Sequence, residues 1–200
     1  MSHDVAVIGL GRVGLPLAIT FADHGLSVLG VDRDADRLAA VRDGRMPFKE
    51  PGTDKALERV LAAGRLDLTE RAADAAQADA IVLTVGTPSF SHIEIDMSEI
   101  RSVLDALLSH LRTGHLLVLR STVGPHTTEF VAGYLEKHRG FRVGEDVFVA
   151  HVPERIAANR FMAEIGTLPC LVGGVGEGSG ERAAQLFEVL GAPIVQTTPV

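Results

Sequence analysis

Short apolar runs alternate with amphipathic segments along this sequence, and that alternation limits the fold more than any other feature. Runs such as "AIVLTV" (80–85) carry few polar residues, which is typical of strands covered on both faces of a sheet. The predicted strands are 4–9, 27–32, 66–69, 80–85, 115–120, 147–151, 169–174 and 193–197. The predicted helices are 13–24, 34–43, 53–63, 98–112, 127–138 and 178–190. This order predicts an α/β fold with a doubly wound, mostly parallel sheet and helices on both faces.

Composition places the chain among globular proteins. Of its 200 residues, 46% are hydrophobic and 22% are charged, and no stretch has the composition of a linker. We therefore expect one domain over residues 1–200. The formal net charge of −7 argues against a general nucleic-acid binder or a binder of anionic membranes, because either needs a basic face.

The cysteine and histidine content adds further expectations. One cysteine allows no intramolecular disulfide and favours a reducing compartment, so we expect a cytoplasmic protein. The N-terminus does not resemble a signal peptide, and no uncharged apolar run reaches the roughly 18 residues of a membrane span. The eight histidines lack ligand-like spacing, so no metal site is predicted.

The segment "GLGRVG" follows the first predicted strand and opens the first predicted helix. Gly9 permits the tight turn, Gly11 lets a pyrophosphate approach the backbone, and Gly14 lets the helix pack on the strand. The helix start, with Arg12 and Val13, offers free N–H groups to the phosphates. A ligand-free turn is the alternative, which the strand–helix–strand context disfavours. The motif thus predicts a Rossmann-like domain that binds a dinucleotide through these residues.

The end of the second predicted strand indicates which dinucleotide binds. Asp32 lies 18 residues after Gly14, where a carboxylate accepts hydrogen bonds from the adenosine ribose hydroxyls. Arg33 comes next and is able to bind a 2′-phosphate. The carboxylate still favours NAD over NADP as the cofactor.

The fourth predicted strand also ends in residues suited to a ligand. In an open parallel sheet, ligands lie beyond the carboxyl ends of the strands. We therefore expect the backbone of Val85 and Gly86, together with Thr87, to face the cofactor. The alternative is an ordinary loop after the strand.

The fifth and sixth predicted strands end in polar groups at the same edge. Ser121 and Thr122 are expected beside the nicotinamide half, where they would hold a polar substrate or a water. The alternative is that they cap the next helix, which Pro125 is suited to begin. Glu154 is a candidate acid or base; the alternative is a solvated glutamate paired with Arg155.

Three other segments are interpreted as structural. "EPG" (50–52) predicts a turn before a helix, and Asp96 or Ser98 is suited to cap the helix that follows. Cys170 lies in an apolar strand without an evident basic partner, so we expect a buried, inert thiol.

Taken in order, "VIGLGRVGLPLA", "GVD", "EPG", "VGTP", "STVGPHTT" and "PERI" resemble the UDP-glucose/GDP-mannose dehydrogenase family. "PER" is similar to the branch that acts on UDP-N-acetylhexosamines such as UDP-N-acetylmannosamine. The resemblance covers the whole chain. It implies an NAD-dependent oxidoreductase of polysaccharide biosynthesis that oxidises C6 of a UDP-sugar to the acid with two NAD, and a full-length protein that is a homodimer.

The same resemblance implies roles for four residues. Thr122 corresponds to a threonine that helps to hold the catalytic water. Glu154 corresponds to a glutamate that works with that water in thioester hydrolysis. Asp32 and Arg37 correspond to the contacts with the adenosine ribose.

The chain also departs from the family pattern. Ala158 stands where many members have a second glutamate, and His126 stands where glycine is usual. The nucleophilic cysteine of the family belongs to a C-terminal UDP-sugar domain, and its essential Lys and Asn belong to the central helix before that domain. We expect both parts to lie outside this chain, and residues 1–200 alone to be inactive.

Two other functions stay open at this point. One is the cofactor domain of a β-hydroxyacid or 6-phosphogluconate type of dehydrogenase, which would place a Gly-rich substrate loop at "STVGP" and a catalytic lysine on the next helix; neither is evident in this sequence. The other is an NAD-binding regulatory module without catalysis.

Overall fold

All eight predicted strands are present in the computed structural model, which describes residues 2–86, 97–157, 159–176 and 178–197. The strands are β1 His3–Ile8, β2 Val28–Val31, β3 Leu66–Thr69, β4 Ala78–Leu83, β5 Leu116–Leu119, β6 Phe148–His151, β7 Cys170–Val175 and β8 Ile194–Gln196. The helices are α1 Gly14–Asp23, α2 Ala35–Arg42, α3 Thr53–Ala62, η1 Ala72–Gln77 (a 3₁₀ helix), α4 Ser98–Leu108, α5 Thr127–Arg139, α6 Phe161–Glu164 and α7 Ser179–Glu188.

The described strands form an eight-stranded sheet in the order β3-β2-β1-β4-β5-β6-β7-β8. Strands β1 to β6 are parallel, and Val5 of β1 lies between Val28 of β2 and Ala80 of β4. Strand β7 is antiparallel to β6. The prediction of a doubly wound, mostly parallel sheet is therefore confirmed.

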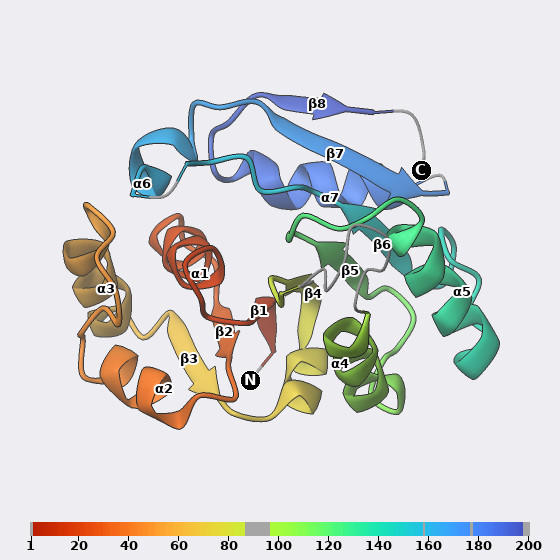
Figure 1. Ribbon diagram of the computed structural model, residues 1–200, viewed down its shortest axis with the longest axis horizontal. Coiled ribbons are helices and arrows are strands. Elements are labelled where there is room, and N and C mark those ends of the chain that lie inside the picture. Colours follow the sequence, from red (N-terminus) through yellow and green to blue (C-terminus); the bar gives the residue numbers. More distant parts are fainter. Residues whose placement is uncertain (1, 87–96, 158, 177, 198–200) are drawn as a thin grey trace.

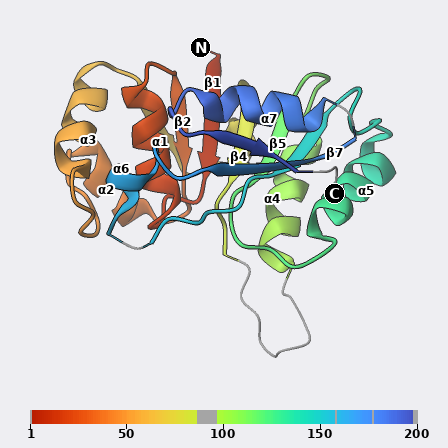
Figure 2. The same ribbon diagram turned by 90° about the horizontal axis from the view of Figure 1, so that it is seen from above.

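The central strands β1 and β4 are apolar from their third residue onward, because both of their faces are covered there. In β1, Val5 and Val7 pack into the core on one face, whereas Ala6 and Ile8 pack into the core on the other. Helices α1, α3 and α7 lie on the first face, and α4 and α5 lie on the second (Figures 1 and 2). From Val5 to Ile8, successive residues thus alternate between two cores, which leaves no exposed position in this part of the strand.

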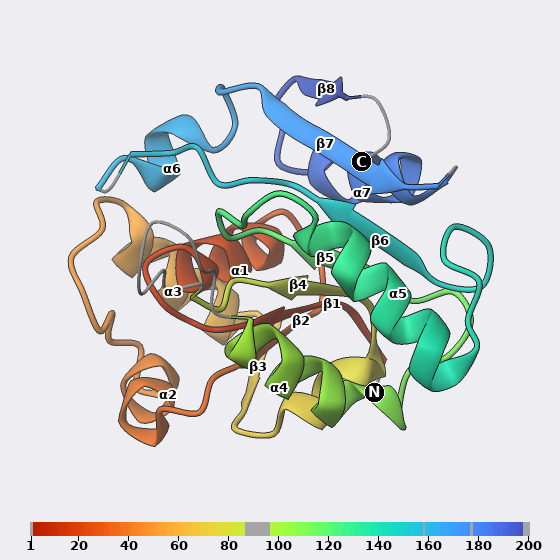
Figure 3. The same ribbon diagram turned by 45° about the vertical axis from the view of Figure 1, so that its right-hand side comes forward.

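Helices α4 and α5 run side by side, and the chain that follows β6 crosses above α1 to reach α6 (Figure 3). Neither α6 nor η1 is predicted from the sequence. Both are too short to give a helical period, and α6 is held through its buried Phe161. The β6–β7 connection therefore contains α6 and an irregular segment instead of a helical crossover between parallel strands.

The strand order reverses between β1 and β4. From β1 the chain continues to β2 on one side, whereas β4 and β5 lie on the other side. In parallel sheets a ligand binds beyond the carboxyl ends of the strands at such a reversal. The carboxyl ends of β1, β2 and β4 are therefore the expected walls of a site.

Candidate cofactor site

The glycine turn after β1 is so tight that it excludes a side chain at Gly9 and at Gly14. Gly9 has φ +95°, a conformation that side chains rarely adopt. A Cβ on Gly14 would lie 1.9 Å from the Gly9 carbonyl oxygen and 2.4 Å from Thr84 Oγ1. Thr84, which follows β4, has its hydroxyl within hydrogen-bond distance of the carbonyl oxygens of Ile8 (3.0 Å) and Gly9. Thr84 thus anchors the turn, a role that the sequence analysis missed.

Gly11 differs from the other glycines of the motif, because the space beside it is open. A Cβ built on Gly11 meets no protein atom within 4 Å. Val13 is the N-cap of α1, and the Arg12 guanidinium lies 5.5 Å from the centre of the Phe48 ring. The missing side chain at Gly11 therefore leaves room next to the first turn of α1, where a phosphate is attracted by the helix dipole.

Asp32 is a buried carboxylate at the end of β2 with several donors around it. Its Oδ2 accepts from the N–H of Leu10 and from Arg37, each at 2.7 Å, and its Oδ1 accepts from the N–H of Asp34 at 2.9 Å. Burial by itself raises the pKa of the Asp32 carboxyl, but these donors together hold that pKa below its usual range. Asp32 therefore carries a full negative charge at neutral pH.

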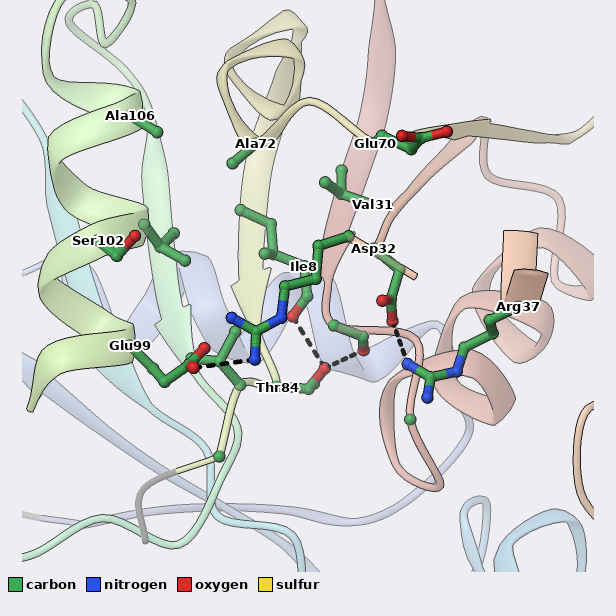
Figure 4. Close-up of a pocket in the computed structure, with 16 residues that line it drawn as sticks. Ile8, Val31, Asp32, Arg37, Glu70, Ala72, Thr84, Glu99, Ser102 and Ala106 are labelled. Atoms are coloured by element: carbon green, nitrogen blue, oxygen red, sulfur yellow. Dashed lines mark hydrogen bonds and ion pairs between the residues drawn. The ribbon is translucent and has the colours of Figure 1, made fainter. Parts of the chain in front are cut away.

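A pocket of about 380 Å³ opens at these strand ends (Figure 4). Its size is that of a small-molecule site. It is lined by Ile8, Gly9, Gly11, Val31, Asp32, Arg33, Arg37, Glu70, Ala72, Thr84, Val85, Gly86, Glu99, Ser102, Val103 and Ala106. The pocket brings together seven residues predicted to bind the cofactor: Gly9, Gly11, Asp32, Arg33, Arg37, Val85 and Gly86.

Helix α4 forms the far wall of this pocket, which the sequence analysis did not predict. Glu99, Ser102, Val103 and Ala106 line the pocket and follow one another at the spacing of one helix face. Their small or polar side chains along a helix that otherwise packs through Leu and Ile are a signal that could have identified them. Figure 4 shows Glu99, Ser102 and Ala106 facing the strand ends from this helix.

The groups after β5 lie at the same edge of the sheet but do not line the pocket. The Ser121 hydroxyl donates to the carbonyl oxygen of Val85 at 2.7 Å, which ties the end of β5 to the end of β4. Thr122 follows it, and Thr87 lies outside the described residues. Among the predicted cofactor contacts, Arg12, Val13, Gly14, Ser121 and Thr122 do not line the pocket.

The alternative that Ser121 and Thr122 cap the next helix is wrong. Helix α5 begins at Thr127 with His126 as its N-cap, so Pro125 does not begin it either. His126 has φ +65°, a conformation natural to glycine, and its ring contacts Glu129 at 2.9 Å. The helix thus starts several residues after the two hydroxyls.

Glu154 is not solvated, and its ion-pair partner is Arg120 rather than Arg155. Its Oε2 lies 2.7 Å from Nη2 of Arg120, and the two side chains are only 9% and 4% exposed. Its Oε1 accepts from the backbone N–H groups of Arg155 and Ile156. The predicted surface alternative for Glu154 is wrong, because Arg120 and the local backbone fix the carboxylate below the surface.

Two other interpretations need correction. Cys170 has a basic neighbour in Arg120, but burial outweighs it and raises the pKa of the Cys170 thiol. The thiol therefore stays protonated at neutral pH, as expected of an inert cysteine. Glu50 is more than part of a turn, since its buried carboxylate accepts from the N–H groups of Asn159 and Phe161.

The predicted cap of α4 differs from the one in the structure. Helix α4 begins at Ser98 with Met97 as its N-cap, so the expectation that Ser98 is the cap is wrong. Asp96, the other candidate cap, and Ala158 lie outside the described residues.

Within the part that the structure describes, no group of three or more His, Cys, Asp or Glu is arranged to hold a metal ion. None of its helices is long and apolar enough to cross a membrane.

The residues that are present fit a dinucleotide. The open space at Gly11 provides room for the pyrophosphate beside the helix N-terminus, and the Asp32 carboxylate is fixed where ribose hydroxyls would donate to it. The pocket between β2 and α4 is apolar at Val31, Ala72 and Val103, which suits a flat base. The site as a whole has the chemistry of the adenosine and pyrophosphate part of a cofactor site.

Comparisons with known proteins show which family of NAD-binding domains the chain resembles. The family described as "UDP-glucose/GDP-mannose dehydrogenase family, NAD binding domain" matches residues 3–191 of the chain. The UDP-N-acetyl-D-mannosamine dehydrogenase of Pyrococcus horikoshii is 34% identical over 183 residues, which are 92% of this chain and 44% of that protein. The GDP-mannose 6-dehydrogenase of Pseudomonas syringae is 32% identical over 198 residues, or 96% of this chain and 45% of that protein.

Solved structures give the same result. The structure of the dehydrogenase from Pyrococcus horikoshii superposes with a TM-score of 0.92 at 33% identity, and it covers 98% of this chain. The chain in turn spans 47% of that structure. The present chain thus corresponds to somewhat less than half the length of the relatives that it matches.

Proposed function

The chain belongs to the UDP-glucose/GDP-mannose dehydrogenase family as its NAD-binding domain, and on that premise we propose that it is the cofactor half of a UDP-sugar 6-dehydrogenase. The proposed reaction oxidises C6 of a UDP-N-acetylhexosamine, such as UDP-N-acetylmannosamine, to the uronic acid with two NAD. The observation that carries the proposal is the family match over residues 3–191 together with the pocket at the ends of β1, β2 and β4.

When bound, NAD would accept a hydride from the sugar carbon. The chain's own residues would position it. Gly11 leaves space for the pyrophosphate at the start of α1, and Asp32 would accept the ribose hydroxyls. Arg37 lies against Asp32 at 2.7 Å and would keep that carboxylate in place.

The proposed chemical residues lie farther along the same edge of the sheet. Thr122 follows β5 and Glu154 follows β6, and these two strands are neighbours. We assign Thr122 to holding the water that hydrolyses the acyl intermediate, and Glu154 to exchanging a proton with that water. The support for Glu154 is its fixed position, because Arg120 and two backbone N–H groups restrain the carboxylate.

The substrate class is proposed from the relatives. Among proteins similar to this chain, several are UDP-N-acetyl-D-mannosamine dehydrogenases and one is a GDP-mannose 6-dehydrogenase. Because the chain covers less than half of them, the groups that bind the sugar nucleotide are expected mostly in a further domain. We also propose that the complete enzyme is a homodimer, and that residues 1–200 form a single domain without turnover of its own.

Turnover assays test this function. The chain would be assayed for NADH formation at 340 nm with UDP-N-acetylmannosamine, UDP-glucose and GDP-mannose, alone and joined to the C-terminal half of the relative from Pyrococcus horikoshii. We expect no NADH from residues 1–200 and NADH from the joined protein, most with the UDP-N-acetylhexosamine. Turnover by residues 1–200 alone, or turnover of a β-hydroxyacid, would contradict the proposal. NAD binding without turnover in any joined protein would favour a regulatory module.

The role of Glu154 has its own measurement. In the joined protein, Glu154→Gln should slow the hydrolytic step and let a covalent adduct accumulate, which mass spectrometry detects. Glu136→Gln, on an exposed position of α5, removes one carboxylate far from the proposed chemistry and is the matched control. Equal adduct levels in the two variants would contradict the assignment.

A further inference from the structure

Arg33 is the pocket residue expected to favour the binding of NADP. It lines the pocket directly after Asp32, and a guanidinium at this place is able to bind a 2′-phosphate through two hydrogen bonds. The sequence alone leaves the effect of Arg33 open, because nothing in the sequence next to it shows where its side chain goes. Whether the pocket prefers NAD or NADP depends on whether the Arg33 guanidinium points toward the ribose 2′ position or away from it.

The structure gives Arg33 a partner on the opposite wall. Its Nη2 lies 3.0 Å from Oε1 of Glu99, which belongs to the first turn of α4, and both residues line the pocket. The ion pair, marked by the dashed line at Glu99 in Figure 4, therefore joins the end of β2 to α4 across the pocket. Arg33 is 84% exposed and Glu99 is 35% exposed, so the pair lies at the mouth of the pocket.

The second guanidinium of the pocket wall is also paired. Arg37 lies 2.7 Å from Oδ2 of Asp32 and 3.3 Å from Oδ2 of Asp34. Glu70 also lines the pocket. Around the expected adenosine position, each of the guanidinium groups in the described wall thus has a carboxylate partner, and carboxylates are in excess.

We propose that Glu99 determines the cofactor preference by holding Arg33 across the pocket mouth and away from the ribose 2′ position. Asp32 alone is an incomplete barrier to NADP, because two backbone N–H groups and Arg37 already compensate its charge. With Arg33 engaged by Glu99, a 2′-phosphate meets Asp32 without a free guanidinium to balance its charge. Glu99 acts here as a positioning residue, and the inference rests on the assignment of this pocket to the adenosine half of NAD.

Competition binding tests the proposal on the chain as it stands. NADH is titrated into the protein and followed by its fluorescence, and NAD⁺ or NADP⁺ then displaces it. In Glu99→Gln the guanidinium of Arg33 is released, and we expect the affinity for NADP⁺ relative to NAD⁺ to rise about fivefold, the upper range for an exposed ion pair. The gain should shrink when the salt concentration is raised to about 0.5 M, because exposed charges are then screened.

Two controls separate the pairing from a general change of charge. Glu70→Gln removes the same single charge from the same pocket without releasing a guanidinium, so the affinity ratio should change much less than in Glu99→Gln. In the Arg33→Gln background, Glu99→Gln should no longer favour NADP⁺. Thermal melting of each variant checks that the fold is intact.

The possible results are distinct. An unchanged ratio in Glu99→Gln, an equal rise in Glu70→Gln, or a gain that persists in the Arg33→Gln background would overturn the role of Glu99. A failure of the unmodified chain to bind NADH would overturn the assignment of the pocket itself, and with it the proposed cofactor half.

Discussion

Replacing Gly11 by Val should separate cofactor binding from folding. A Cβ at Gly11 meets no protein atom within 4 Å, and the backbone there lies outside the left-handed region. The stability of Gly11→Val should therefore stay within about 0.5 kcal/mol of the wild-type chain, or about 2 °C in melting temperature for a domain of this size. The new side chain would occupy the space that the pyrophosphate needs, so NADH affinity should fall at least ~100-fold, about 2.7 kcal/mol.

Gly14→Ala, in contrast to Gly11→Val, should lower the stability of the fold. Its Cβ would lie 1.9 Å from the Gly9 carbonyl oxygen, and this backbone atom cannot move without opening the turn. Overpacking of this kind costs about 1–3 kcal/mol, which corresponds to a melting temperature lower by about 2–12 °C. Gly133→Ala in α5, another glycine with open space around it, is the control: it should leave NADH binding unchanged and should not lower the melting temperature, because alanine is favoured over glycine in a helix interior by about 0.5–1 kcal/mol.

NADH fluorescence titration and thermal melting of the three variants provide the measurements. The expected pattern is a lost binding signal with a normal melt for Gly11→Val and a lowered melt for Gly14→Ala. Retained binding in Gly11→Val would mean that the motif serves only as a turn. A melt of Gly11→Val as low as that of Gly14→Ala would refute the reasoning from the open space.

Three further predictions concern stability and reactivity. Arg120→Met should lower the melting temperature by about 6–20 °C, because it leaves the buried Glu154 carboxylate without its partner at a cost of about 3–5 kcal/mol. Adding Glu154→Gln to this variant should restore part of the lost stability. A melting temperature unchanged by Arg120→Met alone would show that the pair is not buried. Burial lowers the pKa of His115, so the unfolded chain binds a proton there more readily than the folded chain. The free energy of unfolding should therefore be highest above about pH 6.5 and fall as the pH drops below that value. The fall should be smaller in His115→Gln, and an identical pH profile of the two proteins would contradict this prediction. Because the pKa of Cys170 is raised, iodoacetamide should alkylate the native thiol at pH 8 much more slowly than the unfolded one, and equal rates would show an accessible thiolate.

The position of the site within the sheet was predictable because its main elements are local in sequence. The glycine spacing in "GLGRVG" and the carboxylate at the end of the next strand fall within one strand–helix–strand unit, and they identify the pocket at Gly9, Gly11 and Asp32. The α4 wall was not predicted, because the segment carrying Glu99 also fits an ordinary amphipathic helix. Which side of α4 faces the pocket depends on how the helix packs on the sheet.

The eight strands, their alternation with helices, the turn after β1 and the motifs of the family resemblance were all predictable, since each depends on residues close together in the chain. Long-range packing selects the partners of the charged side chains, Arg33 with Glu99 and Arg120 with Glu154. It also selects the antiparallel direction of β7 against β6. The physical reason is that a local pattern specifies the conformation of a segment, whereas its direction in the sheet and the ends of its long side chains are selected by distant segments that pack against it.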